Sequence, residues 1–150
     1  MTQNSLTQYE RELVYHLREE YSFYQSLYIM LDKQRDLVKY DQDEKLLDLF
    51  AEIERCHARI KTSEDKITKL KEIDPRMFRM AAILPEVRKL VNGIATMVKK
   101  NVNLVAESRK YMQGRYDRVK QELGELRNSR QILQYLSEAE PSPHFVDGKG

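Results

Sequence analysis

Residues 13–38 read LVYHLREEYSFYQSLYIMLDKQRDLV, and apolar or aromatic side chains recur along them at intervals of three, four or seven residues. These positions are Leu13, Leu17, Tyr21, Tyr24, Tyr28, Leu31 and Val38. Such intervals place the side chains on one face of an α-helix, because the helix makes about 3.6 residues per turn. The stretch predicts a long helix from about residue 5 to residue 38. We expect Ser5 and Gln8 to form a capping box at its start.

A second helix is predicted between residues 41 and 73, where the same intervals return. Its apolar face holds Leu46, Phe50, Ile53, Cys56 or His57, Ile60, Ser63, Ile67 and Leu70. Asp41 with Glu44 indicates the start, and Asp74 followed by Pro75 indicates the end, because proline disfavours helical geometry in the residue before it. The same pair can cap a new first turn. We expect a short helix or a hydrophobic elbow over residues 75–84.

The third and longest helix is predicted from Pro85 to about residue 136. Its face holds Val91, Ile94, Val98, Asn101, Val105, Ser108, Met112, Tyr116, Val119, Leu123, Leu126, Leu133 and Leu136. Asn101 and Ser108 are polar residues at core-like positions, where buried polar groups fix the register of packed helices. Gly114 and Gly124 each weaken a helix by about 1 kcal/mol relative to alanine. They therefore mark where this helix is expected to bend, fray or end early.

These patterns predict an all-α fold, an elongated antiparallel three-helix bundle of the coiled-coil type. Mixed intervals of three and four favour helices that cross at about 20°. All five glycines and four prolines follow residue 74, so the first half lacks the strongest helix breakers. We assign residues 1–136 to one bundle domain. The ending SEAEPSPHFVDGKG, residues 137–150, is expected to be a flexible C-terminal tail.

Composition excludes several classes of protein. In 150 residues with 41% hydrophobic content, no apolar stretch approaches the eighteen or so residues of a membrane span, so we expect a soluble protein without membrane insertion. The first residues, MTQNSLTQYERE, have neither a cationic leader nor an apolar signal core, which favours the cytoplasm. Cys56 is the only cysteine, which excludes an internal disulfide and a multi-thiolate metal site. We expect it to be a partly buried helical residue.

The charge distribution leaves two interpretations open. Residues 1–74 carry 12 basic and 16 acidic side chains, whereas residues 75–150 carry 14 and 8. The split either draws the two halves together or presents a basic face to nucleic acid. The basic side chains of the third helix are Lys99, Lys100, Arg109, Lys110, Arg115, Arg118 and Lys120. They lack the interleaved aromatic residues typical of nucleic-acid binding, so we favour the first interpretation and expect no nucleic acid as partner.

Catalytic and metal chemistry find little support. Glu54 and His57 have the E-x-x-H spacing of di-iron bundles, but no second copy of the motif occurs. The chain has no glycine-rich phosphate loop and no spacing typical of a catalytic triad. We therefore expect no enzyme activity, no metal and no cofactor. The tyrosines of the first helix, Tyr15, Tyr21, Tyr24 and Tyr28, have a role at the core edge as the favoured reading and a dedicated binding face as the alternative.

The end of the third helix is the candidate binding site. The first two helices, of roughly 35 and 33 residues, are too short to cover a third of about 50. We call the apolar side chains on the excess part the C-terminal stripe: Met112, Tyr116, Val119, Leu123, Leu126 and Leu133. An unpartnered helical stripe is a surface for a second copy of the chain or for a different protein.

Three segments resemble the FlgN family of flagellar export chaperones. Residues 84–119, LPEVRKLVNGIATMVKKNVNLVAESRKYMQGRYDRV, are similar to the family's third helix, with an N-x-N-x-L core at Asn101, Asn103 and Leu104. Residues 24–41, YQSLYIMLDKQRDLVKYD, resemble its first helix and the step into the second. The ending SPHFVDGKG resembles the family's terminus. The segments occur in the family's order and span essentially the whole chain.

The resemblance implies a cytoplasmic helical chaperone of bacterial flagellum biogenesis. Such proteins bind C-terminal helices of hook–filament junction (hook-associated) proteins, prevent premature assembly and deliver them to the type III export gate of the flagellar export apparatus. It also implies that the far end of the third helix binds the client and that Tyr135 corresponds to a gate-docking tyrosine. Family members commonly follow that tyrosine with a glycine-containing turn, whereas LSEAEPSP follows Tyr135. The alternative is a generic coiled-coil interaction protein or a nucleic-acid-binding helical protein.

Overall fold

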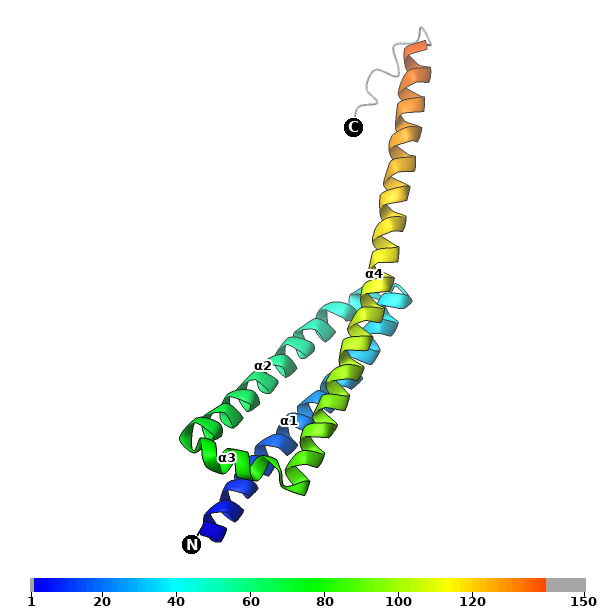
Figure 1. Ribbon diagram of the computed structural model, residues 1–150. Helices are drawn as coiled ribbons and strands as arrows, with labels where there is room; N and C mark the ends of the chain where they lie inside the picture. The colour runs from blue at the N-terminus through cyan, green and yellow to red at the C-terminus, as the bar shows by residue number, and fades with distance from the viewer. Residues whose placement is uncertain (1, 140–150) are drawn as a thin grey trace. The chain divides into compact units, whose positions relative to one another are not determined.

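The computed structural model describes residues 2–139, and the side chains of residues 5–138. It contains four helices, α1 (Thr2–Lys39), α2 (Asp43–Ile73), α3 (Pro75–Ala82) and α4 (Pro85–Ala139), as Figure 1 shows. Every regular element in this range is a helix, so the predicted all-α class is confirmed. Of the predicted tail, residues 137–139 complete α4, and residues 140–150 lie outside the described part of the chain.

The chain divides into two compact units, residues 1–111 and residues 112–150. The first, unit 1, holds α1, α2, α3 and the first part of α4. The described part of the second, unit 2, is the remaining helical segment of α4. The predicted boundary between residues 136 and 137 differs from this division, and it stays a prediction about the limits of the folded domain.

In unit 1, α1 and α2 pack in a regular seven-residue register. The hydroxyl of Tyr9 donates to the Leu70 carbonyl at 2.6 Å. One heptad further along α1, the Ser63 hydroxyl donates to the carbonyl of His16 at 3.3 Å. Another heptad on, the Cys56 thiol donates to the carbonyl of Phe23 at 3.2 Å. The contact positions rise along α1 by seven as they fall along α2 by seven, which is the repeat of knobs-into-holes packing.

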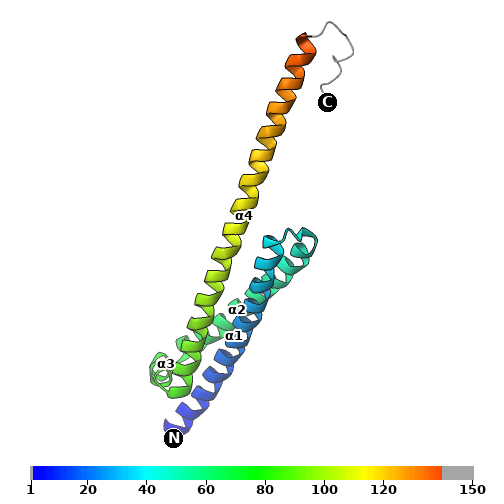
Figure 2. The same cartoon turned by 90° about the vertical axis from the view of Figure 1, so that its right-hand side faces the viewer.

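The first part of α4 lies beside α1 in both views of unit 1 (Figures 1 and 2). Arg35 Nη1 lies 3.2 Å from Glu107 Oε2, and Arg18 forms an ion pair with Glu86. Between these pairs, a Cβ added at Gly93 would lie 3.1 Å from the ring of Tyr21. The absence of a side chain at this position therefore lets the ring approach the α4 backbone closely.

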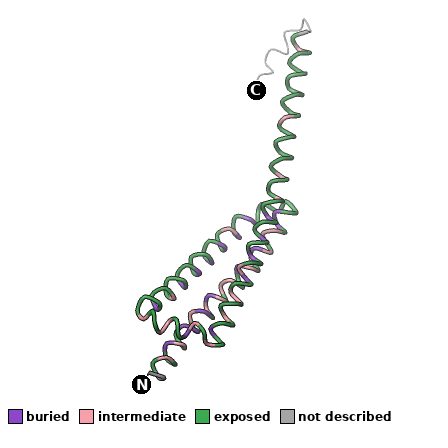
Figure 3. Tube along the Cα trace, viewed as in Figure 1, coloured by how far each residue is buried: buried purple, intermediate pink, exposed green. Residues whose placement is uncertain are grey.

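Two apolar clusters form the core of unit 1, and Figure 3 shows buried residues along α1, α2 and the first part of α4. One cluster contains Leu27, Leu31, Leu37, Val38, Leu46, Leu49, Ile53, Cys56, Ile60 and Leu104. The other contains Tyr9, Leu13, Val14, Leu17, Leu70, Ala81 and Val87, and so includes α3. Burial of large apolar side chains stabilises such a core by about 1.5–3 kcal/mol each.

The boundary after residue 73 follows the prediction, and the segment beyond it is a short helix. The Asp74 Oδ1 atom accepts a hydrogen bond from the Met77 backbone N–H at 3.0 Å, and Pro75 occupies the first helical turn. The aspartate thus satisfies an N–H group that the first turn of a helix leaves unpaired. Proline fits beside it because its missing N–H has no partner at that position in any helix.

Two other predicted helix starts are wrong. Because α1 already begins at Thr2, Ser5 lies inside the helix and does not cap it. The N-cap of α2 is Gln42, which makes no side-chain capping bond, and Asp41 adopts a left-handed backbone with φ of 57° in the turn. Aspartate tolerates this conformation better than most residues, so Asp41 favours the turn between α1 and α2 instead of capping α2.

The predicted apolar faces are correct in period and partly wrong in register. In α1, Glu20 and Leu27 are buried at positions that the prediction gave to neighbouring tyrosines. In α4, Val91 and Val105 are exposed, whereas Met97 and Leu104 are buried. Each of these shifts keeps intervals of three and four, because two adjacent faces of a helix satisfy the same periodicity.

Two further expectations concern the continuity of α4 and the apolar character of the helices. The helix α4 continues through Gly114 and Gly124, so it does not end early at these residues. Within residues 2–139, none of the helices combines the length and apolar character needed to cross a bilayer.

Candidate binding surface

The C-terminal stripe is the largest set of exposed apolar side chains on one face in unit 2. Its members are Met112 (44% exposed), Tyr116 (63%), Val119 (52%), Leu123 (58%), Leu126 (65%) and Leu133 (67%). No side chain between residues 112 and 138 is buried, and Figure 3 draws nearly all of this segment as exposed. Apolar side chains that recur on one helical face at this exposure are typical of a site that a partner covers.

The stripe follows one side of the helix. At about 100° per residue, its six members fall within an arc of roughly 100° around the helix axis. The predicted docking residue Tyr135, 73% exposed, lies roughly 150° away from the middle of that arc. A partner helix on the stripe therefore leaves Tyr135 accessible to a second contact.

Polar side chains of this segment bond locally. The amide of Gln113 donates to Asp117 at 3.0 Å on the side away from the stripe, and the hydroxyl of Ser137 donates to the Gln134 carbonyl at 2.8 Å beyond its last member. Such contacts between residues three or four apart support the helix. Gly114 has no heavy atom within 4 Å of an added Cβ, and the same holds for Gly124. The glycines therefore lower the stability of the helix without serving a close contact among the described residues.

Two apolar residues near the stripe were not among the predicted site residues. Ile132 is 60% exposed and Leu136 is 54% exposed. Leu136 continues the interval of three from Leu133, which was the signal available in the sequence. Ile132 lies off that face, so it widens the apolar surface of the last two turns beyond what a single stripe describes.

The predicted buried polar residues lie in unit 1, as expected. Asn101 and Ser108 are both buried. The Asn101 amide donates to the Tyr24 carbonyl at 3.4 Å, while its Oδ1 atom and the Ser108 hydroxyl have no hydrogen-bond partner among the described residues. A buried polar atom without a partner costs about 1–3 kcal/mol. The cost in stability that was expected of these residues is therefore present, and of the two only Asn101 makes a bond from α4 to α1.

The tyrosines of α1 lie mainly at the core edge. Tyr9 is buried with its hydroxyl bonded to α2. The Tyr24 hydroxyl donates to Glu64 at 3.2 Å, and burial, together with the negative charge of Glu64, raises the pKa of Tyr24 to about 12. Tyr15 is the exception because it is 63% exposed. Rings that pack while their hydroxyls reach polar partners are usual for tyrosine.

The other chemical groups singled out in the sequence are separated or solvated. Glu54 and His57 are exposed on α2, whereas Cys56 takes the alternative buried position. Burial raises the pKa of the Cys56 thiol, so its reactive thiolate form is disfavoured. Among residues 5–138, no three histidine, cysteine or acidic side chains are grouped closely enough to hold a metal ion.

The ion pairs between helices do not follow the charge split of the sequence. Arg18 and Arg35 belong to the acidic half of the chain, yet they pair with Glu86 and Glu107 in the basic half. Each pair thus joins a basic residue of the mainly acidic half to an acidic residue of the mainly basic half. These half-exposed pairs contribute at most about 1 kcal/mol each, so they select helix alignment more than they add stability.

None of the family models, curated proteins or solved structures compared with the chain matches it.

Proposed function

We propose that this protein is a cytoplasmic chaperone of flagellar type III export, in which the C-terminal stripe binds C-terminal helices of hook–filament junction proteins. The exposed stripe on a helical segment with no buried side chains carries the proposal. An amphipathic helix laid on such a stripe buries apolar surface on both partners. The client class comes from the resemblance of residues 24–41, 84–119 and 142–150 to FlgN chaperones.

In this proposal, α1, α2 and the first part of α4 form an antiparallel three-helix bundle of the coiled-coil type that acts as the stable base. The heptad register of residues 9, 16 and 23 with residues 70, 63 and 56 supports it. The chaperone covers the client segment that otherwise drives assembly. Because the contact is non-covalent, release at the export gate needs no bond chemistry. Tyr135, on another side of the helix, docks at the gate.

Titration calorimetry with a peptide from the C-terminal helix of a junction protein tests client binding. We expect Leu123→Ala and Leu126→Ala to weaken binding by about 1–3 kcal/mol each, because anchors near the centre of an interface dominate its energy. Leu47→Ala is the matched control, since Leu47 is 75% exposed on α2 in unit 1. Unchanged affinity in both stripe variants contradicts the proposal.

A secretion assay separates the two proposed contacts. Tyr135→Ala is expected to leave peptide affinity unchanged while it lowers export of the junction proteins. Tyr15→Ala is a matched control, because Tyr15 is a similarly exposed tyrosine on α1. Normal export by the Tyr135 variant contradicts gate docking and leaves client binding to be judged from the calorimetry.

Salt dependence distinguishes the chaperone from a nucleic-acid-binding protein. Phosphate contacts weaken steeply and log-linearly as salt rises, whereas apolar helix packing does not. We expect peptide binding to change little between low and physiological salt. Retention on heparin without affinity for any helical peptide favours nucleic acid instead. Sedimentation of the free protein tests the remaining alternative, a second copy of the chain on the stripe.

A further inference from the structure

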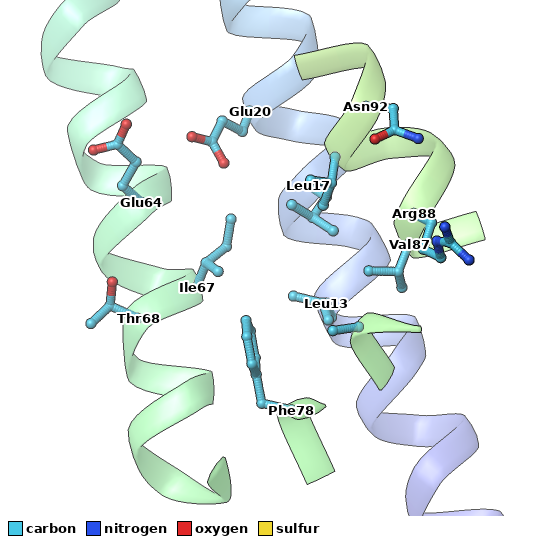
Figure 4. Close-up of a pocket in the computed structure, with 12 residues that line it drawn as sticks. Leu13, Leu17, Glu20, Glu64, Ile67, Thr68, Phe78, Val87, Arg88 and Asn92 are labelled. Carbon is cyan, nitrogen blue, oxygen red and sulfur yellow. The ribbon is translucent and has the colours of Figure 1, made fainter. Parts of the chain in front are cut away.

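Unit 1 contains a cavity of about 690 Å³ bounded by all four helices. Its apolar wall is formed by Leu13, Leu17, Ile67, Phe78 and Val87 (Figure 4). The volume lies within the range of cavities that bind small organic molecules, roughly 300–1,000 Å³. Sites of that kind combine an apolar lining with a few polar groups that orient the ligand.

The polar end of this cavity holds two carboxyl groups. Glu20 comes from α1 and Glu64 from α2; Figure 4 shows the Glu20 carboxylate directed from α1 into the space between the two helices, with Glu64 on α2 at the same level. Glu64 is exposed and accepts the hydrogen bond of Tyr24. Glu20 is only 7% exposed, and no hydrogen bond or ion pair joins it to any side chain among residues 5–138. The Glu20 side chain is thus largely covered while its carboxylate oxygens stay accessible from the cavity, and a carboxylate in such a place without a donor is costly for a protein to keep.

The charges around Glu20 make its position more costly still. Burial and the like charge of Glu64 raise the pKa of Glu20 to about 7, so the group is partly protonated at neutral pH and mostly ionised at pH 8. The cation that lines the cavity, Arg88, is exposed and projects from α4, while both carboxyl groups come from the other two long helices (Figure 4). A positive charge placed between the carboxylates would offset both the burial and the repulsion.

We propose that this cavity binds a small organic cation, a molecule with an apolar body and a primary ammonium group. The body packs against Leu17, Ile67 and Phe78, and the ammonium donates hydrogen bonds to Glu20 and Glu64. An ammonium group has three donors and no acceptor, which matches two carboxylates whose one hydrogen-bond donor among the described side chains is Tyr24. This site lies wholly in unit 1 and is independent of the function proposed for the C-terminal stripe.

The test is calorimetric titration of the full chain at pH 8 with three probes that share one apolar body: 4-phenylbutylammonium, 4-phenylbutan-1-ol and 4-phenylbutyrate. We expect saturable binding of the ammonium, at least roughly tenfold tighter than the alcohol, because charge-assisted hydrogen bonds are about twice as strong as neutral ones. The butyrate should bind most weakly. Equal affinity for ammonium and alcohol, or no saturable binding of the ammonium, overturns the proposal.

Variants assign the binding to the two carboxyl groups. Glu20→Gln should weaken binding of the ammonium roughly tenfold and leave binding of the alcohol unchanged. Glu64→Gln provides a second reading at an exposed position, where folding is not at risk, and should weaken binding by roughly threefold. Asp65→Asn removes the same charge from the neighbouring residue, which is exposed and outside the cavity lining. If Asp65→Asn weakens binding as much as Glu64→Gln, the attraction is a general surface effect and the proposed site is wrong.

Discussion

The two units use the same helical periodicity for opposite purposes. In unit 1 the apolar positions are buried between helices, as Leu13 at 1% and Val38 at 0% exposure illustrate. In unit 2 the same intervals leave Leu123 and Leu126 more than half exposed. An amphipathic helix gains most of its stability from covering its apolar face, which is why we propose a partner for the second pattern. Periodicity therefore identifies the apolar face of a helix. What covers that face depends on which other helices pack against it.

A single charged substitution in each unit tests this difference in burial most strongly. Ile53→Asp should unfold unit 1, with a loss of about 4 kcal/mol or more, because an unpaired carboxylate would replace a residue of 7% exposure. Leu126→Asp should change the free energy of unfolding by less than about 0.5 kcal/mol. Chemical denaturation of both variants measures this. Equal losses would mean that the stripe belongs to the core of the free protein.

The pH dependence of stability tests the pKa of Glu20, the buried acidic residue of unit 1 among residues 5–111. Because the folded pKa of Glu20, about 7, lies above its usual value of 4.5, the folded state binds more protons between these values. The stabilisation that the protonated Glu20 gives the folded state is fully present below pH 4.5 and is lost as pH rises through 7. Glu20→Gln should therefore raise the free energy of unfolding at pH 8 by roughly 1–3 kcal/mol. At pH 5 the gain should shrink, and equal gains at both pH values would contradict the assigned pKa.

A smaller effect is expected at the starts of α2 and α3 in unit 1. Asp74→Ala should cost about 1 kcal/mol, since the carboxylate caps the N–H of Met77. Gln42→Ala is the matched control, because Gln42 occupies the N-cap of α2 without a side-chain capping bond. Its loss should stay near zero. Thermal unfolding resolves the pair, and equal shifts in Tm would rule out capping as the reason for the boundary at Asp74.

The smallest effects concern the glycines of α4. Gly114→Ala should stabilise the helix of unit 2 by up to about 1 kcal/mol, because nothing lies within 4 Å of the added Cβ. Gly93→Ala should gain less, since its Cβ would press on the ring of Tyr21. Hydrogen exchange of the local amides measures both changes. A larger gain at Gly93 would show that the ring moves aside at little cost.

Much of the fold could be predicted from the intervals and the helix breakers, because both are local properties. Asp74 and Pro75 combine a cap with a residue that has no N–H, so their position decides where α2 ends and α3 begins. The start of α1 at Thr2 was not predicted, because Ser5 and Gln8 offer a capping-box pattern three residues later in the sequence. Helix starts depend on weak preferences that packing overrides.

The register of the helical faces was harder to predict, for a reason visible at Glu20. The positions Leu13, Leu17, Glu20, Tyr24 and Leu27 keep strict intervals of three and four, but a search for apolar residues passes over the carboxylate. The tyrosines beside these positions are then chosen instead. A charged residue at a regular core position was the available signal for the cavity, and only the packing of four helices shows the space beside it.

Hydrogen exchange with and without a helical peptide from a junction protein tests the central claim most directly. If the C-terminal stripe is the binding site, the peptide should slow exchange of backbone amides between residues 112 and 136, where the free helix has no buried side chains. The amides of α2 should change little. Protection confined to residues 43–73, with none beyond residue 111, would contradict the account.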